Sequence, residues 1–228
     1  MFIQWHYMSM VRNIPVAFKS GELQLEGIIS EGSNDKPFSI VLCSPEPHLG
    51  GNMDSSVVKR LALDLVTAGY FCFRFNYRGV GSSEGTIDMG QGQVSDAGSA
   101  VQLMENWPTS DAQKLILIGY SYGAGVALRL GLSQANSFAA IVLISPHMKL
   151  PPLGLELVSE AGNINTPMMV ISGDKDLSAS PDSISDWIES LSNKLVTSNI
   201  VVDGDRSWRG KEGQLSVEII EYINKIVL

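Results

Sequence analysis

The sequence predicts a single α/β domain over residues 1–228, built on one doubly wound, mostly parallel sheet that is flanked by helices. Two observations support this prediction. Strand-like and helix-like segments alternate along most of the chain, which is the pattern of βαβ units. Several strand-like segments are short and uniformly apolar, which is typical of parallel strands covered on both faces. A chain of 228 residues can bury a full core in one such domain.

The first segments are expected to form an edge of the sheet. Ile14–Phe18 and Glu22–Ser30 have strand character, the second by its alternation of apolar and polar residues, and Lys19–Gly21 makes a turn between them. We expect these two strands to pair antiparallel. Phe38–Cys43 is uniformly apolar and begins the central, parallel part of the sheet.

The later segments repeat a unit of strand, loop and helix. They are a helix capped by Asp54 and ending at Gly69, a strand over Tyr70–Phe75, a helix over Gln93–Trp107, a strand over Leu115–Ile118, a helix over Ala124–Gln134, strands over Ala139–Ser145 and Pro167–Ser172, a helix over Pro181–Ser192, a strand over Asn199–Val202 and a helix over Gly213–Val227. Because the carboxyl ends of parallel strands lie at one edge of such a sheet, the loops that follow them are expected to share one rim.

The segment Gly119-Tyr120-Ser121-Tyr122-Gly123 lies between a predicted strand and a predicted helix. In that context G-x-S-x-G is the pattern of a nucleophile elbow, a sharp turn that lifts a serine clear of the sheet. Glycine is expected at the flanks because neighbouring backbone comes too close for a side chain. The alternative is a tight turn with a buried serine. We predict that Ser121 is a nucleophile, which would need a base, an acid and an oxyanion hole from other loops.

Composition excludes several other classes of protein. A net charge of -8 argues against nucleic acid as a partner, and no apolar run is long enough to cross a membrane. Cys43 and Cys72 lie in apolar strands, where free thiols are favoured although a disulfide stays open, and the three histidines are scattered, so we expect no metal or other cofactor. Met1–Arg12 lacks the features of a signal peptide, which favours a cytoplasmic location.

Three stretches of the sequence match a known family. They are Ser44–Met53, Arg74–Gly85 and the elbow Gly119–Gly123. Through them the chain resembles the α/β-hydrolase superfamily over nearly its whole length, and within it the small lidless bacterial hydrolases related to dienelactone hydrolase. The resemblance implies an α/β-hydrolase fold without a large lid domain and an esterase-like reaction on a small acyl substrate.

The oxyanion hole and the acid can be assigned to particular positions. The backbone N–H of Tyr122 and one N–H from Glu46, His48 or Leu49 are the candidates for the hole, because the prolines of that loop cannot donate. Relatives often carry His-Pro-His-Pro where this chain has Ser-Pro-Glu-Pro, so Glu46 is expected to disfavour anionic substrates. Gly173-Asp174-Lys175-Asp176 supplies two candidates for the acid. The family pattern Gly-Asp-x-Asp implies Asp176, with Asp174 bracing the loop, and the alternative is that both aspartates only form the turn.

The position of the general base departs from the family pattern. The resemblance implies a histidine after Asp205, and this chain has Arg206 there. An arginine stays protonated and cannot accept the serine proton, but it can pair with Asp176. His147 and His48 follow strands on the same rim, and we consider both as substitute bases, His147 before His48. His6 is not a candidate.

The sequence therefore predicts a serine hydrolase-like protein for small carboxylic ester or thioester substrates, with Ser121 as nucleophile, Asp176 as acid and Arg206 at the position of the base. The alternative is a catalytically silent relative that uses the pocket to bind a small ligand or a partner. The substrate and the oligomeric state are left open.

Overall fold

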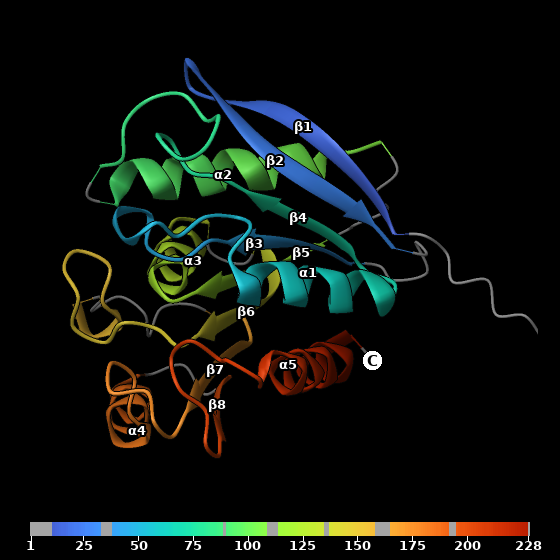
Figure 1. Ribbon diagram of the computed structural model, residues 1–228. Coiled ribbons are helices and arrows are strands. Elements are labelled where there is room, and N and C mark those ends of the chain that lie inside the picture. The colour runs from blue at the N-terminus through green and yellow to red at the C-terminus, as the bar shows by residue number, and fades with distance from the viewer. Residues whose placement is uncertain are drawn as a thin grey trace, which may run out of the picture.

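The computed structural model describes residues 11–32, 38–88, 90–108, 114–134, 137–157, 165–191 and 195–227. In these residues eight strands form one sheet in the order β1-β2-β4-β3-β5-β6-β7-β8 (Figure 1). The strands are β1 (Arg12–Ser20), β2 (Leu23–Glu31), β3 (Phe38–Cys43), β4 (Phe71–Phe75), β5 (Lys114–Tyr120), β6 (Phe138–Ile144), β7 (Met168–Gly173) and β8 (Val196–Val201). The helices are η1 (Pro47–Leu49), α1 (Ser56–Thr67), α2 (Gln91–Glu105), α3 (Tyr122–Ser133), η2 (Leu155–Leu157), α4 (Pro181–Ser190) and α5 (Glu212–Val227).

The pairing of the strands confirms the predicted sheet. β1 and β2 form an antiparallel hairpin, and β2 also pairs antiparallel with β4. From β4 through β3, β5, β6 and β7 to β8 every pair is parallel. All residues of β4, β6 and β7 are buried, which is typical of parallel strands that are covered on both faces of the sheet. The sheet is therefore doubly wound and mostly parallel, as the sequence predicted.

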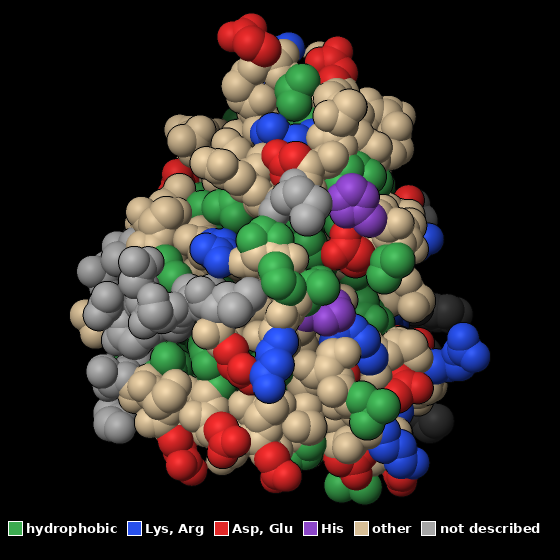
Figure 2. All heavy atoms as spheres, turned by 90° about the vertical axis from the view of Figure 1, so that its left-hand side faces the viewer, with side chains coloured by type: hydrophobic (Ala, Val, Ile, Leu, Met, Phe, Trp, Pro, Cys, Tyr) green, Lys and Arg blue, Asp and Glu red, His purple; other side chains and the backbone are tan. Residues whose placement is uncertain are grey.

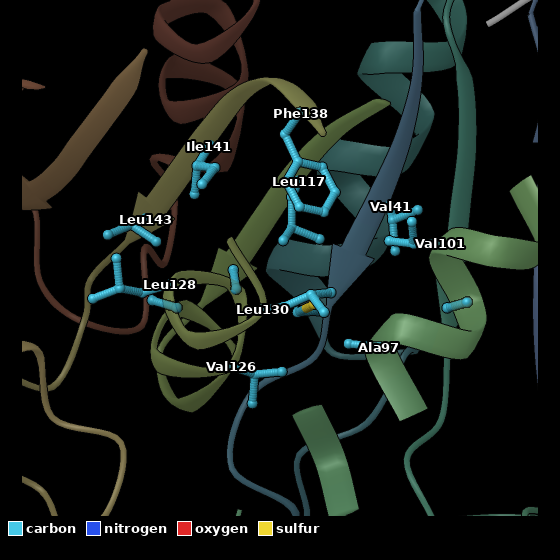
Figure 3. Packing of buried hydrophobic residues seen from close by; sticks show 14 of the residues in the cluster. Val41, Ala97, Val101, Leu117, Val126, Leu128, Leu130, Phe138, Ile141 and Leu143 are labelled. Carbon is cyan, nitrogen blue, oxygen red and sulfur yellow. The ribbon is translucent and has the colours of Figure 1, made fainter. Parts of the chain in front are cut away.

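The helices divide between the two faces of the sheet. Buried residues of α2, α3 and α4 belong to one hydrophobic cluster, and buried residues of α1 and α5 belong to a second cluster on the other side. Figure 3 shows the first cluster from close by, with Val41 and Leu117 on strands of the sheet, Val126 on α3 and Ala97 on α2. Both cysteines are free and buried, as the sequence favoured.

The start of α1 differs from the prediction. We expected Asp54 to cap this helix, whereas the N-cap residue is Ser55. The Asp54 carboxylate instead forms an ion pair with Arg74 of β4, at 2.7 Å between Oδ1 and Nη1. The charged partner offers a stronger hydrogen bond than a backbone N–H, and it is distant in sequence, so the local pattern could not reveal it. Other boundaries shift by a few residues, with β8 beginning at Val196 rather than Asn199.

Candidate functional site

Ser121 lies in the turn between β5 and α3, in a backbone conformation that side chains rarely adopt. Its φ is 59° and its ψ is -115°, and the residue is only 7% exposed. A Cβ atom on Gly119 would collide with the backbone of Gly123, and one on Gly123 would collide with the carbonyl oxygens of Cys43 and Ser44. The flanking glycines are therefore required by close backbone contact, which is the steric reason that the sequence predicted. Strain of this kind is typical of functional sites.

The guanidinium of Arg206 lies between the serine and the acid. Its Nη2 donates to Ser121 Oγ at 2.9 Å, and its Nη1 lies 3.4 Å from each carboxylate oxygen of Asp176. Nη1 also donates to the carbonyl oxygen of Pro146 at 3.4 Å. The predicted pair between Arg206 and Asp176 is thus present, and the arginine side chain occupies the space between Ser121 and Asp176 where a histidine would relay a proton.

Asp176 is held in the loop that follows β7. Its side chain is 1% exposed and accepts hydrogen bonds from the Ser178 N–H at 2.9 Å and from Ser172 Oγ at 3.4 Å. Asp174, the other aspartate of this loop, is exposed. The structure therefore places Asp176 beside Arg206 and leaves Asp174 at the surface.

The loop that carries Arg206 is fixed by two aromatic residues. The Tyr120 hydroxyl donates to the carbonyl oxygen of Arg206 at 2.8 Å, and Trp208 Nε1 donates to Ser145 Oγ at 2.9 Å. Trp208 is fully buried, and burial raises the pKa of Tyr120 to about 12, so that its hydroxyl keeps the donated proton. Sequence patterns alone suggested only packing or pocket-wall roles for these aromatic residues, because their hydrogen bonds join distant parts of the chain.

The candidate oxyanion donors are reduced from three to one on the loop after β3. The His48 N–H donates to Glu46 Oε1 at 3.1 Å, and the Leu49 N–H donates to the Glu46 carbonyl oxygen at 3.2 Å. Within the described residues no acceptor is found for the N–H of Glu46 or for that of Tyr122. These two groups are therefore available to a ligand oxygen, with Tyr122 at the N-terminus of α3.

A mostly apolar cavity of about 330 Å³ opens beside the elbow. It brings together all the predicted pocket residues, and its wall also includes residues that the sequence did not single out. The lining residues are Glu46, His48, Leu49, Asp88, Tyr122, His147, Leu150, Pro151 and Pro152. Figure 2 shows this face of the molecule, where hydrophobic side chains in green lie between histidine side chains in purple. The volume suits a small organic ligand.

The two histidines of the cavity form no hydrogen bond with the serine in the part of the chain that the structure describes. Within the described residues no hydrogen bond joins Ser121 to His48 or to His147, and His6 lies outside those residues. The pKa of His147 is lowered from 6.5 to about 4, chiefly by burial and then by the positive charge of Arg206, while Asp176 opposes the shift. His147 is therefore a neutral imidazole at neutral pH and a weak base.

The described residues contain no cluster of His, Cys, Asp and Glu side chains that could bind a metal ion. Among the helices in the described ranges, none has the length and apolar character needed to cross a membrane.

Comparison with solved structures identifies the fold. A serine hydrolase without a lid from Xanthomonas campestris superposes with a TM-score of 0.80 over 95% of each chain, at 24% sequence identity. The chain therefore has an α/β-hydrolase fold. An esterase from Pyrococcus furiosus has the same fold, with a TM-score of 0.79 at 19% identity, over 96% of this chain and 94% of its own.

Sequence comparisons agree with the fold. A family model described as serine aminopeptidase, S33, matches residues 48–158. That segment includes the elbow but ends before Asp176 and Arg206, so it does not bear on the acid or the base. An uncharacterized protein of Rickettsia prowazekii is 29% identical over 214 residues, which are 91% of this chain and 87% of that protein.

Proposed function

We propose that this α/β-hydrolase binds small carboxylic ester or thioester compounds over Ser121 and turns them over slowly, because Arg206 stands where a base is needed. The observation that carries the proposal is the hydrogen bond from Arg206 Nη2 to Ser121 Oγ, at 2.9 Å. A serine hydroxyl attacks an acyl carbon only when a neighbouring group takes its proton. The guanidinium is already protonated and has no acceptor, so the first proton transfer has no efficient route.

Two features of the site support binding of an acyl group. The N–H groups of Glu46 and Tyr122 have no acceptor within the described residues, and the apolar cavity of about 330 Å³ lies beside them. In serine hydrolases, losing the base costs about a million-fold in turnover, whereas binding and the oxyanion hole still give about 10³ to 10⁴-fold over water. Binding with residual turnover is therefore the expected behaviour.

A second candidate, an active esterase with His147 as the base, is favoured by one observation. His147 lines the same cavity as Tyr122, and its imidazole is neutral at pH 7 because its pKa is about 4. A ligand that displaces Arg206 from Ser121 would leave His147 as a neutral base in the cavity wall. The low pKa limits the rate that such a base can support.

The experiment compares hydrolysis of p-nitrophenyl acetate by the wild type, Ser121→Ala, Arg206→His and His147→Ala. We expect a low wild-type rate that Ser121→Ala abolishes, an increase of about 10² to 10⁴-fold in Arg206→His from a restored general base, and no effect of His147→Ala. Arg209→His, which changes an exposed arginine of the same loop, is the matched control and should leave the rate unchanged.

Each other result selects a different conclusion. Loss of activity in His147→Ala would favour the second candidate. A wild-type rate that survives Ser121→Ala would contradict the proposed nucleophile. No turnover by the wild type or by Arg206→His, together with ligand binding, would favour the catalytically silent alternative.

A further inference from the structure

Arg206 places a permanent positive charge at the centre of the proposed acyl site. A general base needs a free lone pair to accept a proton, and a protonated guanidinium has none, so the cation at this position cannot act as the base. Here Nη2 lies 2.9 Å from Ser121 Oγ, and the described contacts of the guanidinium involve only Nη1 and Nη2 of its three nitrogens. Asp176 balances the charge at 3.4 Å, on the side of the guanidinium contacted by Nη1.

The loop after β3 and the start of α3 supply further donors. The N–H groups of Tyr122 and Glu46 have no acceptor within the described residues, and Tyr122 is the first residue of the twelve-residue helix α3. A helix N-terminus carries a partial positive charge. Ser121, at 7% exposed, directly precedes Tyr122 and accepts from the arginine, and its hydroxyl can donate a hydrogen bond as well as accept one.

From this arrangement we infer that the site preferentially binds the carboxylate of a small organic acid with an uncharged tail, rather than the neutral ester of the same acid. The inference rests on the proposed function, since it assigns the ligand to the same site. One carboxylate oxygen would accept from the N–H groups of Tyr122 and Glu46, and the other from Ser121 and Arg206. Hydrogen bonds between charged partners are roughly twice as strong as neutral ones. A carboxylate is charged and an ester carbonyl is neutral, so the acid should bind more tightly than its ester.

The acidic residues of the cavity constrain the tail of the ligand and do not compete with the carboxylate. The Glu46 carboxylate accepts from the His48 N–H at 3.1 Å, and the Asp88 carboxylate accepts from the Gly90 and Gly92 N–H groups at 2.9 Å each. We expected Glu46 to disfavour anions. In the structure its side chain caps η1 and is partly exposed, so solvent screens its charge. A second carboxylate on the ligand would still meet both residues, which favours monocarboxylates.

Isothermal titration calorimetry with butanoate, methyl butanoate and succinate tests the inference. For the wild type we expect butanoate to bind at least ten-fold more tightly than methyl butanoate and more tightly than succinate. Arg206→Gln removes the charge and keeps hydrogen-bonding groups, so it should abolish the preference for butanoate. Arg209→Gln changes the net charge equally at an exposed position and should leave the preference intact.

The wild-type comparison decides the inference even if a variant folds poorly, which circular dichroism would reveal. Methyl butanoate binding as tightly as butanoate would overturn the preference for the acid and leave the proposed function standing. Binding of neither compound would contradict the proposed function itself. An unchanged preference in folded Arg206→Gln would also overturn the inference, since it would show that the charge is not the cause.

Discussion

Replacing Arg206 by glutamine should destabilise the protein, because it leaves a buried carboxylate without its counter-charge. The Asp176 side chain is 1% exposed, and its nearest cation is Arg206 at 3.4 Å. Its other described partners are the Ser178 N–H and Ser172 Oγ, which are uncharged. They satisfy oxygen lone pairs but do not balance the charge.

The expected magnitude follows from this geometry. At an effective dielectric constant of about 20, two charges 3.4 Å apart attract by about 5 kcal/mol. Desolvation offsets much of that attraction, and the Arg206 side chain is 27% exposed. Breaking a fully buried pair costs about 3 to 5 kcal/mol and an exposed pair contributes about 0 to 1 kcal/mol. For this half-buried pair we expect about 2 kcal/mol, or about 4 to 8 °C in melting temperature.

Urea unfolding of the wild type, Arg206→Gln, Asp176→Asn and the double variant measures the interaction as a double-mutant cycle. Once Asp176 is neutral, removing Arg206 should cost less, so we expect a coupling free energy of about 1 to 2 kcal/mol. Arg209→Gln is the control for a change of net charge. A coupling indistinguishable from zero, or Arg206→Gln as stable as Arg209→Gln, would refute the reasoning.

Three further changes test other parts of the site. Gly123→Ala should lower the free energy of unfolding in urea by about 1 to 3 kcal/mol, because the new Cβ meets a backbone carbonyl of β3. Gly98→Ala on α2 has room for the Cβ and should raise that free energy by about 0.4 to 1 kcal/mol. Tyr120→Phe removes the bond to the Arg206 carbonyl oxygen and should cost about 0.5 to 1.5 kcal/mol; equal stability would mean that this bond does not hold the loop. The pKa of His147 is lowered from 6.5 to about 4, so the unfolded state binds its proton first and stability should fall as the pH drops through that range. Melting temperatures at pH 7 and pH 4.5 should differ less in His147→Gln than in the wild type, and an equal difference would contradict this assignment.

The sequence predicted the sheet well because the information is local. The strand Phe38–Cys43 has the predicted bounds. A short apolar run between polar turns is typical of a buried parallel strand, so the local sequence is enough to predict it. The predicted N-cap of α1 was wrong because Asp54 and Ser55 are adjacent and are both residues that favour this position. Only the ion pair of Asp54 with Arg74, which depends on the folded chain, decides between them.

The candidate site was predictable where a short pattern fixes a backbone shape. Gly119–Gly123 determines the elbow, and its conformation agrees with the prediction. The bond from Arg206 to Ser121 joins residues 85 positions apart, so no local pattern reveals it. Leu150–Pro152 line the cavity without belonging to any motif, and only the folded chain shows their place.

Two contacts that hold the loop at residue 206 do not use the Arg206 side chain. The Tyr120 hydroxyl donates a hydrogen bond to the backbone carbonyl oxygen of Arg206, and Trp208 Nε1 donates one to Ser145 Oγ. These two contacts are independent of the side chain at this position, and arginine and histidine codons can differ by a single base. A single base change at position 206 can therefore exchange a side chain that accepts a proton, histidine, for one that carries a fixed positive charge, arginine, or the reverse.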